Sequence, residues 1–131
     1  MANPNIVSVS SIYAGNAAWA LTTTVTTTLL TVAADVIVKI NSITATNTHA
    51  STVTNLTLDI NGIGTTVTGV TGTSLATVAK IAAVLPVPGS DVLSVIDRPI
   101  YLMEADVLRG GASVATCDLF ICFEVINDAK Y

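Results

Sequence analysis

Charged residues are scarce in this chain of 131 residues. It has 5 lysines and arginines and 9 aspartates and glutamates, which together make up 11% of the sequence, whereas a typical soluble domain has about 25%. Hydrophobic residues make up 51%. The length fits one domain with a core of its own. Charged side chains can therefore form only a small part of its surface. Threonine, serine, asparagine and glycine must form the rest, or other protein molecules must cover it.

Basic residues are the scarcest charge, and they do not cluster. The five cations are Lys39, Lys80, Arg98, Arg109 and Lys130, and the net charge is −4. A protein that binds nucleic acid typically places about 6–10 cations against phosphates from one face. The sequence therefore predicts no nucleic-acid partner, and the same scatter argues against a polybasic membrane anchor.

No apolar run is long enough to span a membrane. A spanning helix needs about 20 apolar residues, and the best candidate, "WALTTTVTTTLLTVAADVIV", is interrupted by threonines and by Asp35. This segment also lacks the basic head and the small-residue cleavage site of a signal peptide. We therefore expect a soluble chain, made in the cytoplasm, that does not contact a membrane.

Histidine and cysteine are too few for the usual metal sites. His49, the only histidine, lies in the polar segment "TNTHAST", and "DINGIG" lacks two of the oxygen ligands that a calcium loop needs. Cys117 and Cys122 are five positions apart, so on one strand they face opposite sides and cannot form a disulfide. We expect Cys117 to act as a small core residue and Cys122 to be a free thiol. The sequence predicts no metal and no cofactor.

The sequence is rich in alternating apolar and polar residues. The odd positions from Ala115 to Val125 are all apolar, while the even positions from Thr116 to Glu124 are mixed. Shorter alternating sets contain Leu56, Leu58 and Ile60, which are separated by Asn55, Thr57, Asp59 and Asn61, and Val7, Val9 and Tyr13, which are separated by serines. Such alternation predicts strands with one buried face.

In "VIVKINSITATN" the apolar set shifts by one position, from Val36, Val38 and Ile40 to Ile43 and Ala45. This shift predicts a β-bulge near Asn41 or Ser42.

Evidence for helix is weak. "SLATVAKIAAVLPVPG" could form one short helix, but it is rich in β-branched residues, so we expect a strand. Turns are expected at Gly15-Asn16, Asn61-Gly62, Pro86, Pro88-Gly89, Pro99 and Gly110-Gly111. Many short strands with little or no helix predict an all-β fold. We expect a single antiparallel β-sandwich over residues 1–131, of which a jelly roll is one form. The low-complexity stretch from Gly62 to Gly72 should be a loop or an extended hairpin.

Two carboxylates, Glu104 and Asp106, lie two positions apart in "IYLMEADVLRGG". A catalytic pair would flank a cleft from separate environments, whereas these two lie between apolar segments, as in a turn between strands. Asp side chains often bond to their own turn. No nucleophile, base or metal cluster accompanies them, so we predict a structural role and no enzymatic activity.

Four motifs can be compared with known proteins: "ANPNIV" after Met1, "SIY" at Ser11–Tyr13, "KINSI" at Lys39–Ile43 and "VIDRPIYLMEADVLR" at Val95–Arg109. In these motifs the chain resembles a group of small virion structural proteins of tailed phages, especially phages of marine cyanobacteria. Members of the group usually carry glycine between the acidic residues of the turn, where this chain has Ala105. The resemblance implies a β-sandwich subunit of a virion, made in the host cytoplasm, with no active site.

Several functions are compatible with these features, and of these we expect a capsid decoration protein. A capsid decoration (cement) protein, which stabilises the shell by protein–protein contacts, would explain the few charges and the small single domain. Its partners would be further copies of itself, with a trimer as one form, and a major capsid or other virion protein. A neck, tail or fibre-base module has similar chemistry but a low copy number. A carbohydrate-binding sandwich would need more exposed aromatic residues than Trp19, Tyr13, Tyr101 and Tyr131 offer.

The final strand suggests where such contacts would form. If the odd positions of this strand face the core, the even positions should face solvent. Two of these even positions, however, are Phe120 and Cys122, which lie between Asp118 and Glu124. An apolar anchor with a polar rim is typical of an interface. The alternative is that a second layer of the same subunit covers Phe120. We favour the interface, with Phe120 and Cys122 as its candidate residues.

Overall fold

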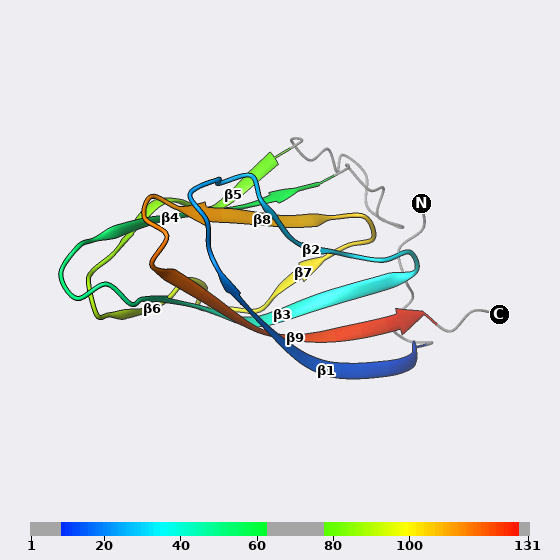
Figure 1. Cartoon of the computed structure of the whole chain (residues 1–131). Helices are drawn as coiled ribbons and strands as arrows, with labels where there is room; N and C mark the ends of the chain where they lie inside the picture. The colour runs from blue at the N-terminus through cyan, green and yellow to red at the C-terminus, as the bar shows by residue number, and fades with distance from the viewer. Residues whose placement is uncertain (1–8, 63–77, 129–131) are drawn as a thin grey trace.

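The computed structural model describes residues 9–62 and 78–128, and it describes side chains only for residues 11–62 and 78–127. These residues form strands, turns and loops and contain no helix, as expected (Figure 1). No helix that could span a membrane occurs in these ranges. The segment Gly62–Gly72 lies outside the described residues from position 63 onward, so its expected conformation is not addressed by the structure.

Nine strands follow one another along the described chain. They are β1 (Val9–Ala20), β2 (Thr28–Thr31), β3 (Val36–Asn47), β4 (Thr54–Asn61), β5 (Val78–Val87), β6 (Val92–Ser94), β7 (Ile100–Leu102), β8 (Val107–Ala112) and β9 (Cys117–Asp128).

The strands form two antiparallel sheets that pack face to face (Figure 1). Sheet A has the order β1-β9-β3-β6, with β7 also paired to β3, and sheet B has the order β2-β8-β4-β5. The predicted antiparallel β-sandwich is therefore confirmed.

The strand order is that of a jelly roll. β1 pairs with β9, β2 with β8, β3 with β6 and β7, and β4 with β5, as in one long hairpin. The β9–β3 and β8–β4 pairings then roll this hairpin into two sheets. If β6 and β7 are counted as one interrupted strand, the nine strands become the eight of a jelly roll.

The core lies between the sheets and is formed by the alternating apolar residues. The largest fully buried apolar side chains are Ile40, Ile43, Leu56, Leu58, Leu102, Leu108, Leu119, Ile121 and Val87. Trp19 and Phe123 pack against this cluster from sheet A. The alternation of β4 and β9 therefore predicted the buried face of each strand.

Two further local predictions are confirmed. The register between β3 and β9 shifts between Ile40 and Ser42, where the apolar pattern predicted a bulge. The ambiguous segment Ser74–Gly89 forms strand β5 over its described part, Val78–Val87. Pro86 fits there because β5 is an edge strand, where one side of the backbone needs no ladder hydrogen bond.

Besides Pro86 in β5, two further expected breaks lie inside strands instead. Gly15-Asn16 is in β1, where a Cβ on Gly15 would approach the Phe123 ring to 3.0 Å. Gly110-Gly111 is in β8, and a Cβ on Gly111 would come within 2.6 Å of the Thr24 carbonyl oxygen. These glycines thus allow close approach of neighbouring groups, which is a second use of glycine in strands.

Three burial predictions were wrong. Tyr13 is 61% exposed near the end of sheet A, Ala115 is exposed just before β9 begins, and Asp59 is almost fully buried. Val7 lies outside the described residues. Strand periodicity identifies the face of a residue, whereas burial also depends on what the tertiary fold places over that face.

Candidate functional site

The centre of the outer face of sheet A is an uncharged surface around Phe120. Phe120 lies opposite Ala18 of β1 and Thr44 of β3. One pair further along β9, Cys122 lies opposite Asn16 and Ser42. Directly opposed residues of antiparallel strands point to the same side of a sheet. The small neighbours leave the Phe120 ring as the largest side chain at the centre of this face.

Phe120 is 42% exposed. No layer formed by the described chain therefore encloses its ring, which is the arrangement the interface hypothesis requires. The interface itself stays a prediction. The neighbouring residue Leu119 is fully buried in the core, so the two faces of β9 differ as the alternation predicted.

Both cysteines are free thiols, and they lie on opposite faces of β9. Burial, and secondarily the charge of Asp118, raises the pKa of the Cys117 thiol, which keeps it protonated and unreactive. Cys122 is half-buried on the outer face beside Phe120. It adds a small apolar group to the surface around that ring.

The charges of β9 border this apolar centre along the strand. Asp118 lies opposite Ala20 and Thr46, and Glu124 lies opposite Ala14 and Lys39. An apolar centre with charges at its ends is the usual layout of a protein–protein contact.

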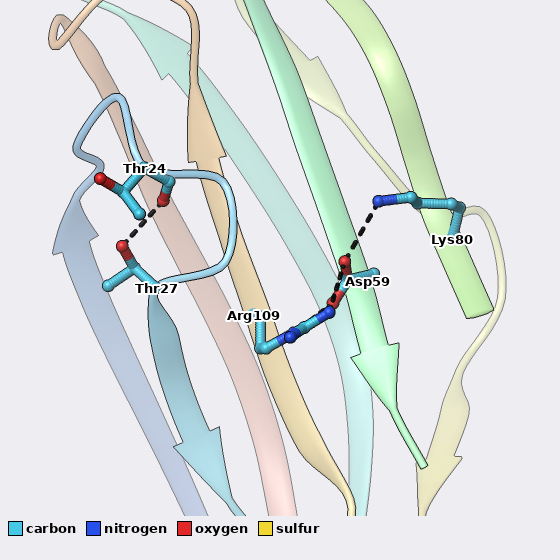
Figure 2. A network of polar contacts seen from close by, with 5 residues as sticks. All are labelled: Thr24, Thr27, Asp59, Lys80 and Arg109. Atoms are coloured by element: carbon cyan, nitrogen blue, oxygen red, sulfur yellow. Dashed lines mark hydrogen bonds and ion pairs between the residues drawn. The ribbon is translucent and has the colours of Figure 1, made fainter. Parts of the chain in front are cut away.

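The outer face of sheet B carries a different feature, a row of charged residues that sequence reasoning missed. Thr28, Arg109, Asp59 and Lys80 lie side by side across β2, β8, β4 and β5. Figure 2 shows Arg109 and Lys80 reaching Asp59 from opposite sides. The Arg109 Nε and Nη2 atoms donate to the two Asp59 carboxylate oxygens at 2.8 and 3.1 Å, and Lys80 Nζ donates to Oδ2 at 3.2 Å.

These contacts explain why Asp59 is only 1% exposed although it points away from the core. Burial raises the pKa of Asp59, but hydrogen bonds from Arg109 and Lys80 and their positive charges outweigh it, and the pKa is lowered overall. The same hydrogen bond raises the pKa of Arg109. The row has a structural role, because each of its charged side chains is paired with one of opposite sign on the neighbouring strand, and these ion pairs join three strands.

The Glu104–Asp106 segment is a turn between β7 and β8, as predicted. Asp106 Oδ2 accepts a hydrogen bond from the Met103 amide at 2.9 Å, and Glu104 Oε2 accepts one from the Asp35 amide at 2.9 Å. The Ala105 amide and the Asp106 carbonyl bond to Val32. Both carboxylates therefore hold backbone of this turn or of the adjacent loop.

The side chains of His49 and of nearby Asn47 also form hydrogen bonds that hold loops in place. The His49 Nδ1 atom accepts hydrogen bonds from the Ser51 and Thr52 amides at 3.2 and 3.0 Å. The buried Asn47 side chain makes four hydrogen bonds, with Thr52, Val87, His49 and Thr116. It thereby joins three connections at one end of the sandwich, another role with no sequence signal.

Metal-binding clusters are absent from the part of the chain that the structure describes, which contains no suitably placed group of three or more His, Cys, Asp or Glu side chains. Within the described residues, exposed aromatic side chains do not gather either. Tyr13 and Tyr101 are exposed on β1 and β7, at opposite sides of sheet A, whereas Trp19 packs against the core. Tyr131 lies outside the described residues.

Among the surfaces described, the outer face of sheet A is thus the best candidate for a functional site. Comparison of the chain with protein-family models, curated protein sequences and solved structures found no match.

Proposed function

We propose that this chain is a structural protein of a phage virion, a decoration protein that stabilises the capsid shell. It would act through contacts with further copies of itself and with a major capsid or other virion protein. The observation that carries this proposal is the uncharged centre of the outer face of sheet A, where Phe120 is exposed among small side chains. An exposed aromatic anchor of this kind stabilises a contact by removing apolar area from water.

The turn at Ala105 supports the resemblance on which the virion assignment rests. Ala105 has a φ of 69°, in the left-handed region. Glycine adopts this region without steric cost, and the similar virion proteins carry glycine at this position. Although this chain has alanine where those proteins have glycine, the turn therefore keeps the conformation that glycine favours.

The composition supports the same proposal at the level of the whole surface. With 14 charged side chains, 5 basic and 9 acidic, the chain has little charge to keep copies apart. Subunits packed on a shell cover one another's apolar area, so a low charge is an advantage there.

Quantitative mass spectrometry of purified virions that encode this chain tests the proposal. We expect many copies per particle, in a fixed ratio to the major capsid protein. A small number of copies would instead favour a neck, tail or fibre-base position and would contradict the decoration assignment. Absence of the chain from purified virions would overturn the virion assignment altogether.

A further inference from the structure

The four edges of the two sheets differ in how they are protected from pairing with another strand. β2, β6 and β7 are short, with four, three and three residues. β5 is longer but carries Lys80, Pro86 and two register shifts. Short strands, charges, prolines and bulges are the usual means of blocking an edge. Three of the four edges are therefore protected from pairing with another strand.

The fourth edge, β1, has none of these protections along most of its length. It has 12 residues, "VSSIYAGNAAWA", without a charged residue or a proline, and its one register shift lies at its start, between Val9 and Ser11. In the described part of the chain only β9 pairs with it. Figure 1 shows β1 at the margin of sheet A. A long, uncharged edge is a template for the addition of another strand.

We infer that β1 pairs antiparallel with β1 of a second copy of this chain, about a two-fold axis perpendicular to sheet A. The two copies of sheet A then form one continuous sheet. This inference rests on the part of the proposed function in which copies contact one another, and it does not depend on contact with a shell.

A second copy suits this edge because no like charges meet there. The net charge of each copy is only −4, and no charged side chain precedes Asp35. In the paired dimer, Asp118 and Glu124 of one β9 are separated from those of the other by three strand spacings. That distance is about 14 Å, which exceeds the screening length of about 8 Å at physiological salt.

The side chains of β1 also suit pairing with themselves. A two-fold axis perpendicular to the sheet keeps the outer faces of both copies on the same side. The outer residues Ala14, Asn16 and Ala18 are small and uncharged, so they can lie beside their counterparts without overlap. Ile12 and Tyr13, which are 60% and 61% exposed, lie along the same edge and would lose exposed area in the dimer.

The size of the contact predicts a weak dimer. A strand of 12 residues is about 40 Å long, and a sheet edge with its side chains is about 10 Å thick. The pair would bury roughly 800 Å² in total, less than the roughly 1,200 Å² of a stable interface. Dimerisation should therefore depend on concentration in solution, and it should strengthen where copies are held side by side.

Two proline variants of the full chain, Ala17→Pro and Ala18→Pro, test this inference. The backbone amides of adjacent strand residues point to opposite edges, so one proline removes a bond to β9 and the other blocks the free edge. We expect one variant to lose thermal stability. The other should keep a native melting temperature, while its dimer dissociation constant rises by at least about tenfold. Sedimentation velocity over a concentration series measures the constant, and Val92→Ala, at an exposed position of β6 on the opposite edge of sheet A, is the control that should leave it unchanged.

A wild-type chain that stays monomeric at millimolar concentration would overturn the inference, as would a trimer, which closes by a different kind of contact. So would a folded edge variant that dimerises like the wild type. These results are separate from those on the virion. If β1 pairs as expected but virions lack the chain, the pairing stands and the proposed function fails.

Discussion

At the scale of single residues, β9 places two adjacent side chains in opposite environments. Leu119 is fully buried between the sheets, whereas Phe120 is exposed on the outer face of sheet A. A residue buried in the core contributes to folding, while an exposed aromatic residue contributes to stability mainly when a partner covers it. The pair therefore allows folding and the proposed assembly contact to be tested separately at two adjacent positions.

We predict that Phe120→Ala leaves the subunit folded but weakens assembly. The free energy of unfolding of the monomer should change by no more than about 0.5 kcal/mol, whereas binding to shells stripped of this protein should weaken by about 2 kcal/mol per contact. Urea unfolding of dilute protein and a binding titration measure the two effects.

Leu119→Ala is the control, because it should destabilise the monomer by about 2–5 kcal/mol through a core cavity. A loss of about 3–5 kcal/mol for Phe120→Ala would place Phe120 in the core and would refute the interface assignment.

We also predict that Ala105→Gly stabilises the subunit by about 0.5–1 kcal/mol. The left-handed conformation at Ala105, with φ of 69°, costs an alanine roughly 1–2 kcal/mol. Glycine avoids this cost, although its freer unfolded chain offsets part of the gain. Thermal unfolding of the two proteins measures the difference, and a lower melting temperature for the variant would show that the turn does not adopt this conformation.

At the scale of strands, the charged row of Arg109, Asp59 and Lys80 joins β8, β4 and β5 on the outer face of sheet B. The two cations lie against the buried Asp59 carboxylate. If either cation were removed, the Asp59 carboxylate would stay partly buried, but it would lose part of the hydrogen bonding that offsets the cost of burying it. Arg109 matters more, since it forms two of the three hydrogen bonds.

This row predicts a contribution to stability that is lost in acid. The pKa of Asp59 is lowered by folding, so the folded state binds fewer protons at this site than the unfolded chain. The stabilisation is complete above the unfolded pKa of about 4. It disappears as the pH falls through the lower folded pKa.

Asp59→Asn should therefore lose about 1–3 kcal/mol at pH 7, and the deficit should shrink in strong acid. Urea unfolding at several pH values measures this. The exposed Asp118→Asn is the control and should change stability by less than about 0.5 kcal/mol at pH 7. A deficit for Asp59→Asn that is the same at every pH would contradict this account.

The strands also show which features the sequence could predict. Alternation along β4 and β9 and the shift in β3 depend on local pattern, so they predicted the buried face and the bulge. The burial of Asp59 depends on which residues the β8 and β5 registers place beside it, and no local pattern encodes that. The same holds for Gly15 and Gly111, whose roles come from Phe123 and from the loop carrying Thr24. The candidate site was predictable in part, because Phe120 breaks the polar pattern of its face, whereas the exposure of the β1 edge depends on topology.

At the scale of the whole molecule, the fold is a jelly roll whose two outer faces differ. Sheet B holds a paired row of charges on its outer face, and sheet A presents small uncharged side chains around Phe120. The long edge of β1 borders that same face of sheet A. One side of the sandwich thus has the features expected of contact with other proteins.

If the proposed function is right, this side of the sandwich contacts other proteins in an assembled particle. A reconstruction of the intact virion at a resolution that shows side chains would reveal these contacts. We expect a jelly-roll subunit on the shell in many symmetry-related copies, with the Phe120 ring in each copy covered by a neighbouring protein. Copies whose outer face of sheet A is open to solvent throughout the particle would contradict it.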